Sequence, residues 1–169
     1  MGSGKKTVPA RRISRLRAVQ ALFQMEASGA GLEQVVEDFN SGLLDDGDDG
    51  PEFARSDLAF FRSLLEFTLS HQRQIDRLTS DQLKDGWKID RIDPTLRALF
   101  RAAGAELLLK RTPLRVTISE FVEIAKAFFP DGKAAGFVNG VLDGMARSAR
   151  PGDFAHPSEE QSSGPTEIS

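Results

Sequence analysis

Cysteine is absent from this chain of 169 residues, and histidine occurs only twice, as His71 and His156. Without cysteine there is no disulfide framework, no thiolate nucleophile and no zinc site that depends on sulfur ligands. The two histidines are far apart in sequence and do not form a cluster with metal-ligand spacing. We therefore expect no bound metal.

Long apolar runs are also missing. No stretch of about 18 apolar residues occurs, so we expect no membrane-spanning helix. The start of the chain, from Met1 to Lys6, leads into charged residues rather than an apolar segment. We therefore expect no secretory signal and a cytoplasmic location.

The sequence also lacks the patterns of common active sites. It has no G-x-G-x-x-G, so no dinucleotide-binding unit is predicted. Gly4-Lys5 lacks the first glycine and the Ser or Thr of a phosphate-binding loop, and the acidic run at 45–50 does not match the calcium-loop pattern. We expect no catalytic residue, no cofactor and no enzymatic activity.

The charges that are present are unevenly distributed, although the net charge is only −3. Residues 1–25 hold six basic residues and no acid, whereas residues 31–60 hold nine acids and one arginine. A basic end on an acidic body suggests a localised contact with a polyanion. Charge alone leaves a solvated N-terminal tail as an equal alternative.

Apolar residues recur with helical spacing along most of the chain, and no segment alternates as a strand would, so the fold class predicted is all-α. We predict a flexible basic N-terminus at 1–9, an all-helical domain at 10–150 and a disordered, Pro- and Ser-rich tail at 151–169. Predicted helices cover 11–27, 32–39, 52–78, 94–111, 116–129 and 133–147, with a turn or short helix at 84–92 that holds the only tryptophan, Trp87.

Three arginines are expected on one surface of the first predicted helix. Arg11, Arg12 and Arg15 are one and four residues apart, which places them together on its first turns. We expect all three to be exposed. This periodicity favours a basic binding surface over a solvated tail.

Three stretches together resemble the NusB family of bacterial transcription antitermination factors. The first runs from Ala10 through Arg15 to the Ala18-Val19-Gln20-Ala21-Leu22-Phe23-Gln24 segment. The second joins Ile92-Asp93-Pro94 to Leu99-Phe100-Arg101 and Glu106-Leu107-Leu108, and the third runs from Ser119-Glu120 to Phe137-Val138-Asn139-Gly140-Val141-Leu142-Asp143. The resemblance covers about residues 10–147 and omits the acidic loop and the tail.

The resemblance implies a helical domain of about seven helices that binds boxA-type single-stranded RNA of ribosomal RNA leader transcripts. It implies NusE, a small-subunit ribosomal protein, as the partner, within an antitermination complex on RNA polymerase. The RNA-binding residues carried over by motif are Arg11, Arg12, Arg15, Phe23, Phe128, Asp131 and Phe137. Single-stranded RNA is held by basic groups along its backbone and by aromatic rings that stack on its bases, which suits these residue types.

Several points stay open at this stage. Ile13 interrupts the arginine run, Phe23 replaces the usual tyrosine, and the loop around Asp131 is one residue longer than usual in the family. Core packing is the alternative role for Phe23, Phe128 and Phe137. Family members include monomers and homodimers, so a homodimer is open, as is the face that binds NusE. Alternative functions are a helical protein-interaction module and a stand-alone relative of the RNA-binding domain of rRNA cytosine methyltransferases.

Overall fold

The computed structural model describes residues 10–41, 57–84 and 87–154. Within these ranges the chain forms seven α-helices and two 3-10 helices and contains no strand. The elements are α1 (Ala10–Ser28), α2 (Leu32–Asn40), α4 (Leu58–Ser70), α5 (Gln72–Ser80), η1 (Ile89–Arg91), α6 (Pro94–Leu109), α7 (Leu114–Phe128), α8 (Lys133–Ala149) and η2 (Pro151–Phe154). The all-α prediction and its approximate number of helices are confirmed.

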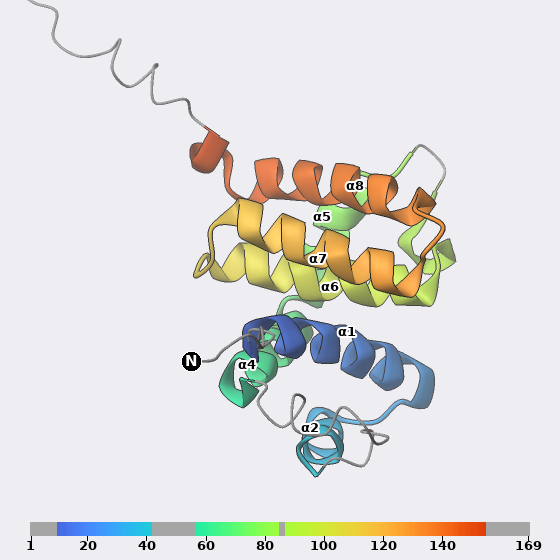
Figure 1. Cartoon of the computed structure of the whole chain (residues 1–169), viewed down its shortest axis with the longest axis vertical. Coiled ribbons are helices and arrows are strands. Elements are labelled where there is room, and N and C mark those ends of the chain that lie inside the picture. The colour runs from blue at the N-terminus through green and yellow to red at the C-terminus, as the bar shows by residue number, and fades with distance from the viewer. Residues whose placement is uncertain (1–9, 42–56, 85–86, 155–169) are drawn as a thin grey trace, which may run out of the picture.

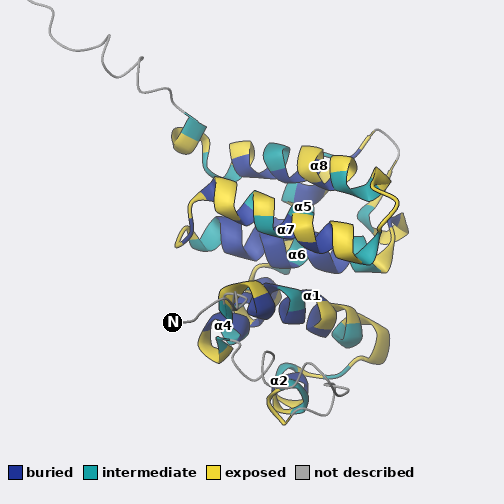
Figure 2. Ribbon diagram, in the orientation of Figure 1, coloured by how far each residue is buried: buried dark blue, intermediate teal, exposed yellow. Residues whose placement is uncertain are grey.

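Helix α6 lies at the centre of the fold and contacts α1, α4, α5, α7 and α8. It begins as the sequence predicts, because the Asp93 carboxylate accepts a hydrogen bond of 2.7 Å from the backbone N–H of Thr95, and Pro94 occupies the first turn. It ends at Leu109, where Lys110 adopts the left-handed conformation with a φ of 59°. Every residue from Arg97 to Leu107 except Arg101 is buried, which makes the middle of α6 the core of the domain (Figure 2).

The other helices lie on two sides of α6. Helices α7 and α8 lie on one side, with α5 behind them, and α1, α4 and α2 lie on the other (Figure 1). The close approach of α5 and α8 to α6 depends on Gly104, because a Cβ at that position would lie 2.6 Å from Ile75 Cγ2 and 3.1 Å from Met145 Cε. A residue without a side chain therefore permits the three-helix contact.

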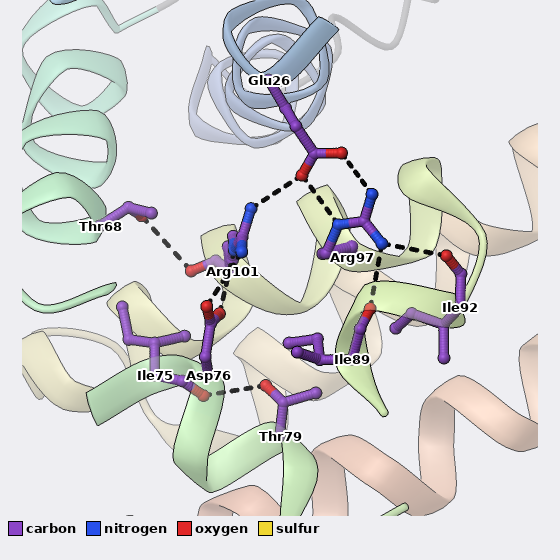
Figure 3. A network of polar contacts seen from close by, with 9 residues as sticks. All are labelled: Glu26, Thr68, Ile75, Asp76, Thr79, Ile89, Ile92, Arg97 and Arg101. Atoms are coloured by element: carbon purple, nitrogen blue, oxygen red, sulfur yellow. Dashed lines mark hydrogen bonds and ion pairs between the residues drawn. The ribbon is translucent and has the colours of Figure 1, made fainter. Parts of the chain in front are cut away.

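Charged networks at both ends of α1 fix it antiparallel to α6. Near the start of α1, Arg15 pairs with Glu106 in the last turns of α6. Near its end, Glu26 pairs with Arg97 and Arg101 in the first turns of α6 (Figure 3). The Arg101 guanidinium continues the network to Asp76 of α5 through two hydrogen bonds of 2.9 Å.

Two sequence-based predictions differ from the structure. The predicted helix at 52–78 is two helices, α4 and α5, which meet at His71 with φ −124° and ψ 23°. The predicted tail begins at 151, but residues 151–154 form η2, and Phe154 packs against the core. By contrast, the turn or short helix predicted at 84–92 is confirmed, since the 3-10 helix η1 lies there. Residues 1–9, the acidic loop and 155–169 lie outside the described residues, so the predictions made for them stay predictions.

Candidate nucleic-acid interface

Arg11 and Arg12 occupy the first turn of α1 with side chains that are half exposed. The Arg11 guanidinium lies 4.8 Å from the centre of the Phe60 ring, and its Nε lies 3.8 Å from Asp57 Oδ2. The α1 helix has no acidic residue in its first turn. Two arginines are thus held at the surface beside the N-terminal end of α1, where backbone N–H groups also favour an anion.

Glu120 of α7 forms an ion pair with the Arg12 guanidinium. Arg12 donates two hydrogen bonds of 2.8 Å, from Nε and Nη2, to the two oxygens of this carboxylate. These hydrogen bonds hold the pKa of Glu120 below its usual value, and the same contact raises the pKa of Arg12. The pair is therefore charged at neutral pH. The third guanidinium nitrogen of Arg12, Nη1, makes no hydrogen bond to Glu120, so its N–H groups can donate to another acceptor.

Arg15 lies inside the protein, so its predicted exposure is wrong. Its side chain is 5% exposed and donates hydrogen bonds of 2.8 and 2.7 Å to the Glu106 carboxylate, which is 1% exposed. Its Nη1 is also 3.6 Å from Glu120. Arg15 cannot reach a bound strand from this position, and it supports Arg12 indirectly because both arginines contact Glu120.

The three phenylalanines predicted to contact RNA differ in exposure. Phe23, on α1, is 42% exposed and is not part of the core. Phe137, on α8, is 37% exposed, and its ring lies 5.8 Å from Phe100 in an edge-to-face arrangement. Phe128, at the end of α7, is half-buried against the core. Core packing therefore describes Phe128 best, while Phe23 and Phe137 present aromatic surface to solvent.

Asp131 is exposed in the connection between α7 and α8. Its carboxylate accepts a hydrogen bond of 3.0 Å from the backbone N–H of Lys133, and Gly132 has the positive φ of 82° that this turn requires. Asp131 thus fixes the start of α8, the helix that carries Phe137 one turn further along.

The predicted residues form two groups. Arg11 and Arg12 lie at one end of α1, and Arg12 pairs with the middle of α7. Phe128, Asp131 and Phe137 lie around the end of α7, and Phe23 lies toward the same end of the bundle, since Glu26 one turn later pairs with the start of α6. Glu120 and Phe128 are about 12 Å apart along the helix axis. Stacked nucleotides of one strand are about 3.4 Å apart, so this distance spans about three to four nucleotides.

The structure contains functional candidates that sequence reasoning missed. Glu106 and Glu120 carry no sequence signal of their role, because they are 91 and 108 positions from their arginine partners. Trp87 is 58% exposed, and the signal for that is local, since it lies in the polar segment Lys84-Asp85-Gly86-Trp87-Lys88 without an apolar stripe.

Other site types receive no support within the described ranges. No group of three or more His, Asp or Glu residues in them could hold a metal ion. No helix among these residues has the length and apolarity to cross a membrane.

Comparison with known proteins agrees with this architecture. The sequence profile of the NusB family matches residues 12–147. The transcription antitermination protein NusB of Caulobacter vibrioides is 43% identical over 149 residues, which are 88% of this chain and 99% of that protein.

Solved structures are similar as well. NusB of T. maritima superposes with a TM-score of 0.67 and 33% identity, over 88% of this chain and 99% of that one. A structure described as the antitermination factors NusB and NusE in complex with dsRNA superposes with a TM-score of 0.66, over 82% of this chain and 97% of that one. Its identity is 24%, so it supports the fold alone. From the profile match and the extent of these similarities, the chain belongs to the NusB family.

Proposed function

We propose that this protein is a transcription antitermination factor that binds boxA-type single-stranded RNA of ribosomal RNA leader transcripts. Its family membership and its 43% identity to a protein named for transcription antitermination support the process. The observation that carries RNA binding is the pair Arg11 and Arg12, held half-exposed at the start of α1.

Phosphates would bind to this basic end, and bases would stack at the other end of the interface. Guanidinium groups suit phosphate oxygens because their planar donors match the spacing of those oxygens. Phe23 and Phe137 supply exposed rings for unstacked bases, which is how proteins hold single-stranded RNA. Phe128 lies at the end of α7 and Asp131 in the connection that leads into α8, the helix that carries Phe137.

The partner in this proposal is NusE, acting with this chain in an antitermination complex on RNA polymerase. The support is family membership together with the sequence motifs of the first and last helices. The protein would act by binding and would perform no catalysis, and it would work in the cytoplasm, where bacterial transcripts are made. A homodimer would compete with this assembly if it covered the basic end of α1.

A titration with labelled boxA RNA, in the presence and absence of NusE, tests the proposal. Fluorescence anisotropy should give tighter binding with NusE than without it, and a scrambled RNA of equal length and composition should bind more weakly. Light scattering of each mixture reports whether a homodimer is present. If boxA RNA and its scrambled control fail to bind even with NusE, the protein is instead a helical protein-interaction module.

A further inference from the structure

An apolar pocket of about 310 Å³ lies between the segment that follows α5 and the first turns of α8. Two aromatic residues, Trp87 and Phe137, line it together with the aliphatic side chains of Leu83 and Val141. Trp87 is 58% exposed and Phe137 is 37% exposed, so both rings present surface to solvent. Such a concave, mostly apolar site with exposed rings has the general character of a ligand pocket.

The Trp87 backbone N–H and the residues that follow it make hydrogen bonds to described residues, although the Trp87 side chain is exposed. The Trp87 N–H donates a hydrogen bond of 2.9 Å to the carbonyl of Lys84. Two residues later, the Ile89 carbonyl accepts a hydrogen bond of 3.0 Å from Arg97, which belongs to the charged network of α1 and α6 (Figure 3). On the other side of the pocket, Phe137 is held by its edge contact with Phe100.

Two glycines leave the α8 side of the pocket open. Gly136 and Gly140 are one turn apart on α8, and a Cβ built at either position meets nothing within 4 Å. A flat ring could therefore approach the helix backbone there. Glycine in a helix interior is less stable than alanine, so two glycines on one open face of α8 favour a role in contact with a ligand.

The polar groups of the pocket suit a nucleobase. The Gln82 amide supplies a donor and an acceptor, and Lys84 supplies an ammonium group at the exposed rim. None of the described residues that line the pocket is acidic. Aromatic faces, one amide and one cation together match the flat face, the polar edge and the neighbouring phosphate of a nucleotide.

We propose that the Trp87–Phe137 pocket takes one unstacked base of the bound single-stranded RNA. This inference rests on the proposed RNA-binding function and adds to it the place of one base and the residue, Trp87, that contacts it. The pocket adjoins the candidate interface, because Phe137 lines the pocket and is also one of the exposed phenylalanines of that interface. This shared residue argues for RNA as the occupant.

The chain carries its own reporter for this contact. Trp87 is the only tryptophan and there is no tyrosine, so emission excited at 295 nm in this protein comes from the pocket alone. Fluorescein-labelled boxA RNA reports total binding by anisotropy, and unlabelled RNA of the same sequence is used to follow Trp87. We expect Trp87 emission to be quenched in parallel with binding, and an abasic nucleotide at one position of the RNA to remove the quenching.

Substitutions test the same contact without unfolding the protein. Trp87→Ala should weaken RNA binding roughly 5- to 150-fold, as expected for one stacked base, with the salt dependence unchanged. Val116→Ala, which truncates another exposed apolar side chain, should have no effect. Gly140→Leu should fill the pocket and weaken binding, whereas Gly140→Ala should leave binding closer to that of the unsubstituted protein.

The outcomes separate the two proposals. Absence of RNA binding by anisotropy overturns the proposed function and this inference together. Normal RNA binding without quenching of Trp87, or normal affinity of Trp87→Ala, overturns only the pocket assignment. Quenching by NusE alone, unchanged when RNA is added, also overturns it and assigns the pocket to the protein partner.

Discussion

The guanidinium of Arg15 and the carboxylate of Glu106 form a buried ion pair between α1 and α6, joined by hydrogen bonds of 2.8 and 2.7 Å. Both side chains are at most 5% exposed. Close, doubled contacts of this kind offset the hydration that both groups lose on burial. Arg15 therefore joins two helices, whereas Arg11 and Arg12 on the same helix face solvent.

Loss of one partner of this pair should strongly destabilise the fold. Arg15→Ala leaves the Glu106 carboxylate buried without its main counter-charge, which should lower the free energy of unfolding by about 3–5 kcal/mol. Urea denaturation followed by circular dichroism measures this change. The double variant Arg15→Met with Glu106→Leu removes both charges and should recover much of the loss. Equal stability of Arg15→Ala and the unsubstituted protein would refute a structural role.

The burial of Arg15 shows where sequence reasoning stops. Helical spacing correctly placed Arg11, Arg12 and Arg15 near one another, but it assigned arginine to solvent by residue type. Helix α1 packs against α2, α4, α6 and α7, so residues on most of its circumference are buried, Arg15 and Arg17 included. The partner that makes burial possible, Glu106, is 91 positions away and leaves no local signal.

The break between α4 and α5 at His71 is a second feature that the sequence does not predict. Apolar spacing continues from Leu58 through Ile75, and no proline or glycine interrupts it, so a single helix was the natural prediction. The chain turns there because α5 packs on α6 and α8, and tertiary packing decides a boundary that propensity leaves open. Where local chemistry does mark a boundary, as at Asp93-Pro94, the prediction is confirmed.

Release of Arg12 from its carboxylate should strengthen RNA binding. Glu120→Gln removes a negative charge beside the proposed phosphate site and frees the Arg12 donors, so we expect affinity to rise by about 2- to 5-fold at low salt, a gain of about 1 kcal/mol or less. Anisotropy with boxA RNA measures the change. Asp143→Asn is the matched control, because it removes a carboxylate that pairs with Arg147 of α8 instead. Affinity that falls in Glu120→Gln would show that Glu120 is needed to position Arg12.

Acid should lower the stability of the folded protein, in part by protonating Glu26. Hydrogen bonds from Arg97 hold the pKa of Glu26 below its usual value in the folded protein. The unfolded chain therefore binds more protons as the pH falls, so this stabilisation is present above about pH 4.3 and is lost as the pH falls through the lower folded pKa. Glu26→Gln should lower stability at pH 7 and flatten the decline below about pH 5 in urea denaturation. The exposed Glu37→Gln serves as control, and an acid decline identical to that of the unsubstituted protein would contradict the assignment.

Two glycine-to-alanine substitutions should change stability in opposite directions. Gly104→Ala places a methyl group 2.6 Å from Ile75 Cγ2 in a filled core and should cost about 1–3 kcal/mol. Gly140→Ala points a methyl group into open space on a helix and should gain up to about 1 kcal/mol. Thermal unfolding of the two variants gives the comparison directly. A Gly104→Ala protein as stable as Gly140→Ala would mean that α5 and α8 can move away from α6 at little cost.

The salt dependence of RNA affinity tests the central claim, RNA binding by the exposed start of α1, most directly. If three or four phosphates are neutralised, the logarithm of affinity should fall with the logarithm of salt concentration at a slope of roughly −2 to −3. The Arg11→Ala, Arg12→Ala double variant loses two of these contacts, so its slope should be smaller in magnitude by about 1.4. An unchanged slope in a folded double variant would contradict the account, because it would place the phosphate contacts elsewhere on the protein.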